Sequence, residues 1–186
     1  MNMLKLANIN YKIKNIFFKL TFNEKAIYNN KLKIMKKHGI KYGKNLRCFS
    51  NILGPESYLI TIGDNVTIST DVKFITHDNS VIKLALNGTD VFGKINIGDN
   101  CFIGSGSIVL PGVTLANNII VGAGSIVTKS FNEENIVIGG NPAKKICDIE
   151  DFKRKNAKLI HDMTGLDYIS KKNYLLQLND DELIRK

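Results

Sequence analysis

Residues 97–132 read IGDNCF, IGSGSI, VLPGVT, LANNII, VGAGSI and VTKSFN, which are six consecutive groups of six residues. Each hexad begins with Ile, Leu or Val, and these first residues are Ile97, Ile103, Val109, Leu115, Val121 and Val127. Since these three residue types make up 52 of the 186 residues, six matches in one fixed frame would occur by chance about once in two thousand trials. The hexads therefore form an internal repeat.

A period of six matches neither an α-helix nor the two-residue alternation of a long strand. It is typical of short strands joined by turns, with three faces to a coil and the coils stacked as a solenoid. The first position then supplies a large aliphatic side chain to the interior. The fifth position points inward near a corner and should be small. It is small in four hexads, at Cys101, Ser107, Val113 and Ser125, and bulkier in the other two, at Ile119 and Phe131. We therefore expect a mainly β fold, a parallel β-helix of hexapeptide repeats.

The repeat continues upstream in a different frame. Hexads begin at Ile62, Ile68 and Phe74, and Ile62 lies 35 residues before Ile97, which is not a multiple of six. Residues of about 80–94 are therefore expected to leave the coils as a loop. Downstream, the sequence IGGNPAKK from Ile138 contains glycine and proline residues that should end the repeat.

The two ends of the chain lack the repeat. We expect a basic helical segment at 1–39, the β-helix at 40–147, and one or two helices at 148–186. Residues 1–47 hold 12 Lys/Arg and one acid, whereas the rest holds 14 against 16. Apolar residues recur at helical spacing at Ile9, Ile13, Ile16, Phe17 and Leu20. This pattern favours a helix packed on the coils or on a neighbouring subunit over peripheral contact with an anionic membrane, although both readings stay open.

The composition excludes several classes of protein. Because the surplus of positive charge belongs to one terminal segment, the net charge of +9 does not indicate nucleic-acid binding. No run approaches the ~18 apolar residues of a membrane span, and no secretion signal is visible. The three cysteines have neither metal nor disulfide spacing. We expect a cytoplasmic protein that requires no metal.

The hexads, the segment Ile75-Thr-His-Asp before the loop, and the ending VGAGSIVTK…IGGNPAK resemble the hexapeptide-repeat acetyltransferase family. The resemblance covers about residues 45–147 and is greatest to sugar O-acetyltransferases of the galactoside, maltose and capsule type. It implies a left-handed β-helix, acetyl-coenzyme A (acetyl-CoA) as co-substrate, and a homotrimer with each active site between two subunits.

The resemblance also implies a histidine as general base at the start of the loop. His77 is the only histidine within the repeats, and a neutral imidazole can take the proton of a sugar hydroxyl near neutral pH. Asp78 should point to the opposite face, whereas Asn79 shares the face of His77 and could orient it if the segment stays extended. An asparagine of the family that contacts the acceptor maps to Asn51. The acceptor-binding candidates are therefore Asn51 and Asn79.

For the donor, the family lays the pantetheine arm of coenzyme A along a groove between subunits. Ser105 and Ala123 hold matching positions there, and a bulky side chain at either would fill the channel. Thr128 and Lys129 match contacts to the nucleotide end. Lys144 matches a basic residue that meets phosphate, with Lys145 as a second possibility.

The function most strongly indicated is O-acetylation of a sugar hydroxyl, in a saccharide or in an envelope or capsular polysaccharide precursor. N-acetylation of an amino sugar, including a nucleotide-linked one, and O-acetylation of an amino acid are alternatives within the family. A carbonic anhydrase on the same fold would need three histidine ligands, and the repeats hold only His77. A non-catalytic β-helix scaffold would have no need of a histidine followed by a loop.

Overall fold

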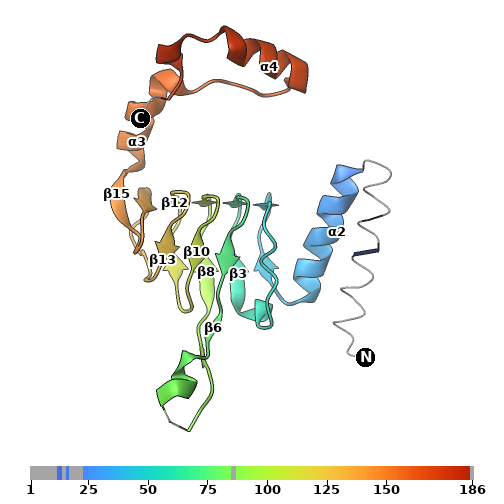
Figure 1. Ribbon diagram of the computed structural model, residues 1–186, viewed down its shortest axis with the longest axis vertical. Coiled ribbons are helices and arrows are strands. Elements are labelled where there is room, and N and C mark those ends of the chain that lie inside the picture. The colour runs from blue at the N-terminus through green and yellow to red at the C-terminus, as the bar shows by residue number, and fades with distance from the viewer. Residues whose placement is uncertain (1–11, 14–15, 17–22, 85–86, 185–186) are drawn as a thin grey trace. The chain divides into compact units, whose positions relative to one another are not determined.

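The computed structural model of the chain describes residues 12–13, 16, 23–84 and 87–184. Three sheets form the three faces of a left-handed parallel β-helix, drawn in Figure 1. Sheet A contains, in order, β1 (Lys41–Tyr42), β3 (Ile60–Ile62), β8 (Ile95–Ile97) and β11 (Thr114–Leu115). Sheet B contains β2 (Arg47–Cys48), β4 (Thr67–Ile68), β9 (Phe102–Ile103), β12 (Ile120–Val121), β14 (Ile136–Gly139) and β15 (Lys144–Asp148). Sheet C contains β5 (Lys73–Phe74), β10 (Ile108–Val109) and β13 (Ile126–Val127).

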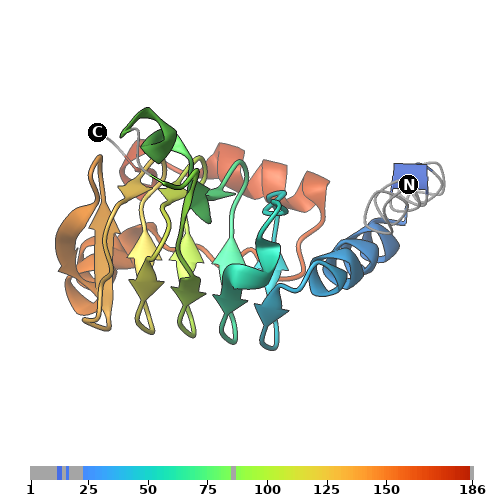
Figure 2. The same cartoon turned by 90° about the horizontal axis from the view of Figure 1, so that it is seen from below.

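The strand register confirms the period of six. Ile103 pairs in parallel with Val121, which is 18 residues or three hexads further along the chain. Ile68 pairs with Ile103 across 35 residues, because the loop is inserted between these two coils. Figure 2 shows the coils stacked side by side with their turns aligned.

The buried residues confirm that the side chain at the first position of each hexad points into the interior. Its members are at most 3% exposed, and they are Ile97, Ile103, Val109, Leu115, Val121 and Val127. The fifth position also points inward, but the expected restriction to small residues is too strict. Ile119 occupies it with 0% exposure, so this corner of the interior has room for a branched side chain. Stacking covers both sides of the inner coils and joins the aliphatic residues into one core.

Asparagines form the turns between sheets A and B. Asn45, Asn65, Asn100, Asn118 and Asn135 all have positive φ angles, between 54° and 61°. Asparagine tolerates this left-handed conformation better than most residues with a side chain. The carboxamide of Asn45 donates to that of Asn65 at 2.9 Å, and that of Asn118 donates to Asn135 at 3.0 Å. The turns therefore support one another from coil to coil.

Helix α2 (Glu24–Lys37) covers the N-terminal end of the β-helix. The Tyr28 hydroxyl donates to the carbonyl of Leu46, and Lys31 Nζ donates to the carbonyl of Cys48 at 2.7 Å. Met35 of this helix is buried in the core. Most of the apolar row expected between Ile9 and Leu20 lies outside the described residues.

The loop leaves the coils at His77 and forms a hairpin arm (green in Figure 1). Strand β6 (His77–Asp78) pairs antiparallel with β7 (Val91–Phe92), and the 3-10 turn η2 (Ser80–Leu84) lies between them. The chain rejoins sheet A at Ile95. Several apolar side chains of the arm are exposed in the single chain, namely Ile82, Leu84, Val91 and Phe92.

The chain divides into two compact units, 1–146 and 147–186. The second contains α3 (Ile149–Asn156), η3 (Ala157–Leu159), α4 (Tyr168–Gln177) and η4 (Asp180–Glu182). Within it His161 contacts the Tyr174 hydroxyl through Nδ1 at 2.9 Å and donates from Nε2 to the Glu182 carbonyl at 3.0 Å. None of the described residues from 147 onward is buried. Across the described ranges, no helix is both long and apolar enough to cross a membrane.

Candidate active site

His77 lies where the chain turns out of the β-helix. Strand β5 ends at Phe74, whose side chain is buried, and two residues later Thr76 is buried again. His77 then begins β6, opposite Phe92 of β7, with 6.1 Å between the two ring centroids. Its side chain is 35% exposed, so the ring is held at the surface but remains accessible.

Glu56 of the preceding coil holds the imidazole ring. Its Oε2 lies 2.9 Å from His77 Nδ1 and accepts a second hydrogen bond from the Thr76 hydroxyl at 3.0 Å. The Glu56 side chain is only 16% exposed, which shields the pair from water. Glu56 is not among the residues predicted from the sequence. Its one signal in the sequence is that it is the only acid between Glu24 and Asp64.

The contact with Glu56 determines which nitrogen of the His77 ring can accept a proton. When Nδ1–H donates to the carboxylate, Nε2 carries the lone pair and can accept a proton. The negative charge of Glu56 then stabilises the imidazolium that forms. A carboxylate that fixes the tautomer and orientation of a histidine is the arrangement found in enzymes that use the ring as a general base.

A cavity of about 240 Å³ lies beside His77. Its lining includes Asn51, Leu53 and Pro55 from the first coil, and Lys73 and His77 from the second. Asn51 Oδ1 accepts a hydrogen bond from the Leu53 amide at 3.3 Å. The structure thus brings Asn51 and His77 to one cavity, although 26 residues separate them in the sequence.

Asn79 does not hold the ring, because the extended segment ends at Asp78. The Asn79 carbonyl accepts from the amide of Ile82 at the beginning of the η2 turn, and its side chain is exposed. Asp78 Oδ1 accepts from the Ser80 amide at 2.8 Å, and this hydrogen bond keeps the pKa of Asp78 below its usual value. Asn79 could orient the His77 ring only in a segment that stays extended, and the segment is not extended at Asn79. Glu56 contacts the ring instead.

Ser105 and Ala123 stack at the corner between sheets B and C. The amide of Gly124 donates to the Ser105 carbonyl at 2.8 Å, which places the two turns one above the other. Gly106 and Gly124 have φ angles of 71° and 69°, and a Cβ built on either would meet nothing within 4 Å. The corner is therefore open on its outer side.

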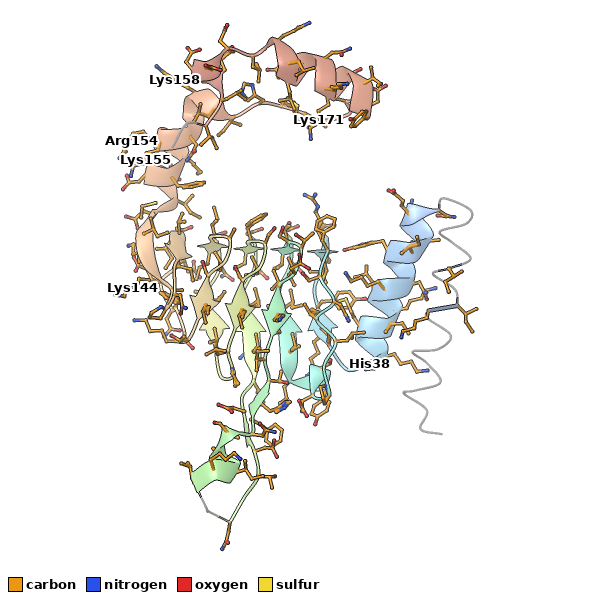
Figure 3. The ribbon with its side chains drawn as sticks, in the orientation of Figure 1. His38, Lys144, Arg154, Lys155, Lys158 and Lys171 are labelled. Atoms are coloured by element: carbon orange, nitrogen blue, oxygen red, sulfur yellow. The ribbon has the colours of Figure 1, made fainter. Side chains whose placement is uncertain are left out.

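The other candidates for donor binding lie further along the chain. Thr128 and Lys129 follow β13, and Lys129 Nζ is 5.7 Å from the centroid of the Phe131 ring. Lys144 begins β15 and is exposed (Figure 3). Lys145 forms an ion pair with Glu133 at 2.6 Å, so its charge is already partly compensated.

Most of these residues flank sheet C. Ser105 and Ala123 precede its strands β10 and β13, whereas His77 and Thr128 follow β5 and β13. The acceptor-side candidates belong to the first two coils, and the donor-side candidates to later ones. Substrates bound along the outer face of sheet C would therefore extend from His77 to Ser105 and Ala123.

The described residues support neither a metal site nor a reactive thiol at Cys48 or Cys101. No group of three or more His, Cys, Asp or Glu in the described ranges is arranged to hold a metal ion. Burial raises the pKa of the Cys101 thiol to about 11 and also raises that of Cys48. Neither thiol is therefore a nucleophile near neutral pH.

Comparison with known proteins identifies the repeat. A family model described as the hexapeptide repeat of succinyl-transferase matches residues 94–129. Protein CapG of Staphylococcus aureus is 45% identical over 169 residues, which cover 88% of this chain and 95% of CapG. Galactoside O-acetyltransferase of Escherichia coli is 36% identical over 113 residues, covering 60% of this chain and 55% of the relative. A solved structure of galactoside acetyltransferase in complex with coenzyme A superimposes with a TM-score of 0.55 at 27% identity, covering 83% of this chain and 88% of that one.

Proposed function

Since this chain belongs to the hexapeptide-repeat acetyltransferase family, we propose that it transfers the acetyl group of acetyl-CoA to a hydroxyl of a sugar. The acceptor is a saccharide or a precursor of an envelope or capsular polysaccharide. The observation that carries the proposal is the hydrogen bond between Glu56 and His77 at the edge of a cavity that Asn51 also lines. The coenzyme A and galactoside named for the relatives support the choice of donor and acceptor class.

In the proposed reaction His77 Nε2 takes the proton of the acceptor hydroxyl as the oxygen attacks the thioester carbonyl. The C–S bond then breaks, and the proton on Nε2 passes to the departing thiolate of coenzyme A. Asn51, and more distantly Asn79, would hydrogen-bond the sugar and hold its hydroxyl within reach of the ring. No acyl-enzyme is needed, in keeping with the buried, protonated thiols of Cys48 and Cys101.

The donor would lie along the outer side of the corner formed by Ser105 and Ala123. The small side chains there leave backbone groups accessible to the pantetheine arm. Thr128, Lys129 and Lys144 would meet the nucleotide end, where lysine ammonium groups suit the negative charges of the phosphates. Lys144 is favoured over Lys145 because Lys145 is paired with Glu133.

Enlarging Ala123 to Leu is expected to weaken the binding of coenzyme A by about tenfold, a loss of ~1.4 kcal/mol. Ala123 is exposed on the proposed groove, so the larger side chain would obstruct the donor without disturbing the core. Calorimetric titration with coenzyme A measures the effect. Ala157→Leu, the same change at an exposed position of η3, is the matched control and should bind normally. Unchanged affinity in Ala123→Leu would place the donor elsewhere.

We expect the enzyme to be a homotrimer in which a neighbouring subunit covers sheet C and completes the groove. Outward residues of this sheet include the half-buried Ile108 and Ile126. The apolar side chains exposed on the hairpin arm also call for a covering surface. Light scattering on the purified protein should give the mass of three chains. An active monomer would contradict this assembly, because all residues of the site would then have to come from one chain.

We infer a cytoplasmic location, and the alternative to be tested against it is peripheral contact with the membrane through the basic N-terminal segment. Fractionation of cells in low and high salt distinguishes the two locations. A membrane-bound fraction released by salt would support electrostatic attachment by the lysines of residues 1–47.

The proposal is tested by incubating the protein with acetyl-CoA and a panel of saccharides, with a thiol reagent to detect coenzyme A. Release of thiol that depends on a saccharide is expected. Transfer only to amines would favour the amino-sugar reaction. Absence of transfer to any acceptor would favour a scaffold.

A further inference from the structure

One lysine lies in the proposed acceptor cavity. Lys73 is the only Lys or Arg among the residues that line the cavity beside His77. It occupies an outward position of β5, between the buried residues Val72 and Phe74. Its side chain therefore projects from sheet C toward the space in which the sugar would lie.

Within the single chain, no described residue neutralises the positive charge of Lys73. Its register partners in the neighbouring strands along this face are Ile108 and, one coil further, Ile126. No ion pair or side-chain hydrogen bond joins Lys73 to a carboxylate within the described ranges. Glu56, the acid closest to the base, is engaged by His77 and Thr76. Within one chain, Lys73 thus carries an uncompensated positive charge in a row of outward side chains whose other members, Ile108 and Ile126, are apolar.

The position of Lys73 favours contact with the acceptor sugar over contact with coenzyme A. The cavity is built from the first two coils, where Asn51 and His77 also lie. The residues proposed for the donor, Ser105 and Ala123, belong to the turns before β10 and β13, on later coils. A group contacting Lys73 would therefore be part of the molecule whose hydroxyl reaches His77.

We propose that Lys73 selects an acceptor sugar that carries an anionic group, a carboxylate or a phosphate, close to the hydroxyl that is acetylated. This inference rests on the proposed function and narrows its substrate class. An ammonium pairs well with either anion, and a hydrogen bond between charged groups is about twice as strong as a neutral one. In a partly enclosed cavity such a contact would be screened less than on an open surface.

The test compares matched acceptors. Galactose, galacturonic acid and galactose 1-phosphate are offered to the wild-type enzyme, and kcat/KM is measured for each by thiol release. We expect one or both anionic sugars to exceed galactose by about tenfold, which corresponds to ~1.4 kcal/mol. The two anionic arms distinguish a carboxylate from a phosphate. In Lys73→Gln the preference should disappear through a higher KM for the anionic sugar, with kcat nearly unchanged, and Lys73→Arg should retain it.

The control is Lys41→Gln, which removes an exposed lysine from an outward strand position on sheet A. It should leave the preference intact, whereas a general effect of surface charge would change both variants alike. Calorimetry with coenzyme A tests the assignment to the acceptor, since Lys73→Gln should bind it with unchanged affinity. Equal use of charged and neutral sugars by the wild type, an unchanged preference in Lys73→Gln, or weakened coenzyme A binding in that variant would overturn the inference.

A separate binding measurement distinguishes failure of this inference from failure of the proposed function. Galacturonic acid and galactose 1-phosphate are titrated into the protein saturated with coenzyme A, and galactose is titrated as the reference. Tighter binding of an anion that is lost in Lys73→Gln supports the inference even without turnover. Equal binding of all three sugars contradicts it. Absence of thiol release with every acceptor of the larger panel counts against the proposed function instead.

Discussion

Replacing His77 by alanine is expected to lower kcat by about 10²–10⁴-fold, the usual contribution of a general base. The ring accepts the proton of the acceptor hydroxyl in the proposed reaction, and His77 is the one histidine among the described residues that line the cavity. Affinity for coenzyme A should change little, because the residues proposed to bind the donor lie on later coils. Steady-state kinetics with a saccharide acceptor, together with calorimetry for coenzyme A, measure the two effects.

His161→Ala provides the control for this substitution. His161 contacts Tyr174 and Glu182 in the second unit, so its loss should alter the local structure there without lowering kcat strongly. Undiminished activity in His77→Ala would show that the base lies elsewhere. An equal fall in both variants would indicate a general effect of removing a histidine.

Glu56→Ala is expected to lower kcat by about 10²-fold. The variant loses both the acceptor for Nδ1–H and the charge that stabilises the imidazolium, two functions for which carboxylates in catalytic triads are known. KM for the acceptor should change less than kcat, since Glu56 acts through His77. Glu56→Gln keeps a hydrogen-bond acceptor but loses the charge, so its kcat should fall between those of the wild type and Glu56→Ala.

Thr76→Val is the matched control for Glu56. It removes the other hydrogen bond to the same carboxylate oxygen and leaves the bond to His77 in place. Its kcat should therefore remain within about tenfold of the wild type, because the hydrogen bond that it removes does not involve the ring. If Glu56→Ala were as active as Thr76→Val, the contact with His77 would have only a structural role. Circular dichroism confirms that each variant is folded.

Much of the fold could be predicted from the sequence because a solenoid repeats the same local environment. The first positions pair with one another from coil to coil, as Ile103 does with Val121 and Val109 with Val127, so each carries the same aliphatic requirement. The prediction is less accurate at positions where the repeat does not determine the size of the side chain. Ile119 is buried at a position expected to hold a small residue, because packing within one corner is set by its own neighbours.

The site was predictable to a smaller extent. His77 stood out because it is the only histidine in the repeats and precedes the break in the frame. Its contact with Glu56 joins residues 21 positions apart through the stacking of two coils, and no periodicity in the sequence indicates such a pair. Asn79 is the orienting residue only in an extended segment, and the η2 turn begins directly after it. The donor residues and the inter-subunit groove stay predictions, as does the role of the N-terminal segment.

The central claim is that this chain moves an acetyl group from acetyl-CoA to a sugar oxygen with His77 as base. Its most direct test is mass spectrometry of the saccharide panel after incubation with isotope-labelled acetyl-CoA, using the wild type and His77→Ala side by side. The account predicts a labelled sugar that loses its acetyl group in mild alkali, as an ester does, and that is nearly absent with His77→Ala. A labelled product stable to alkali, or equal labelling by both proteins, would contradict it.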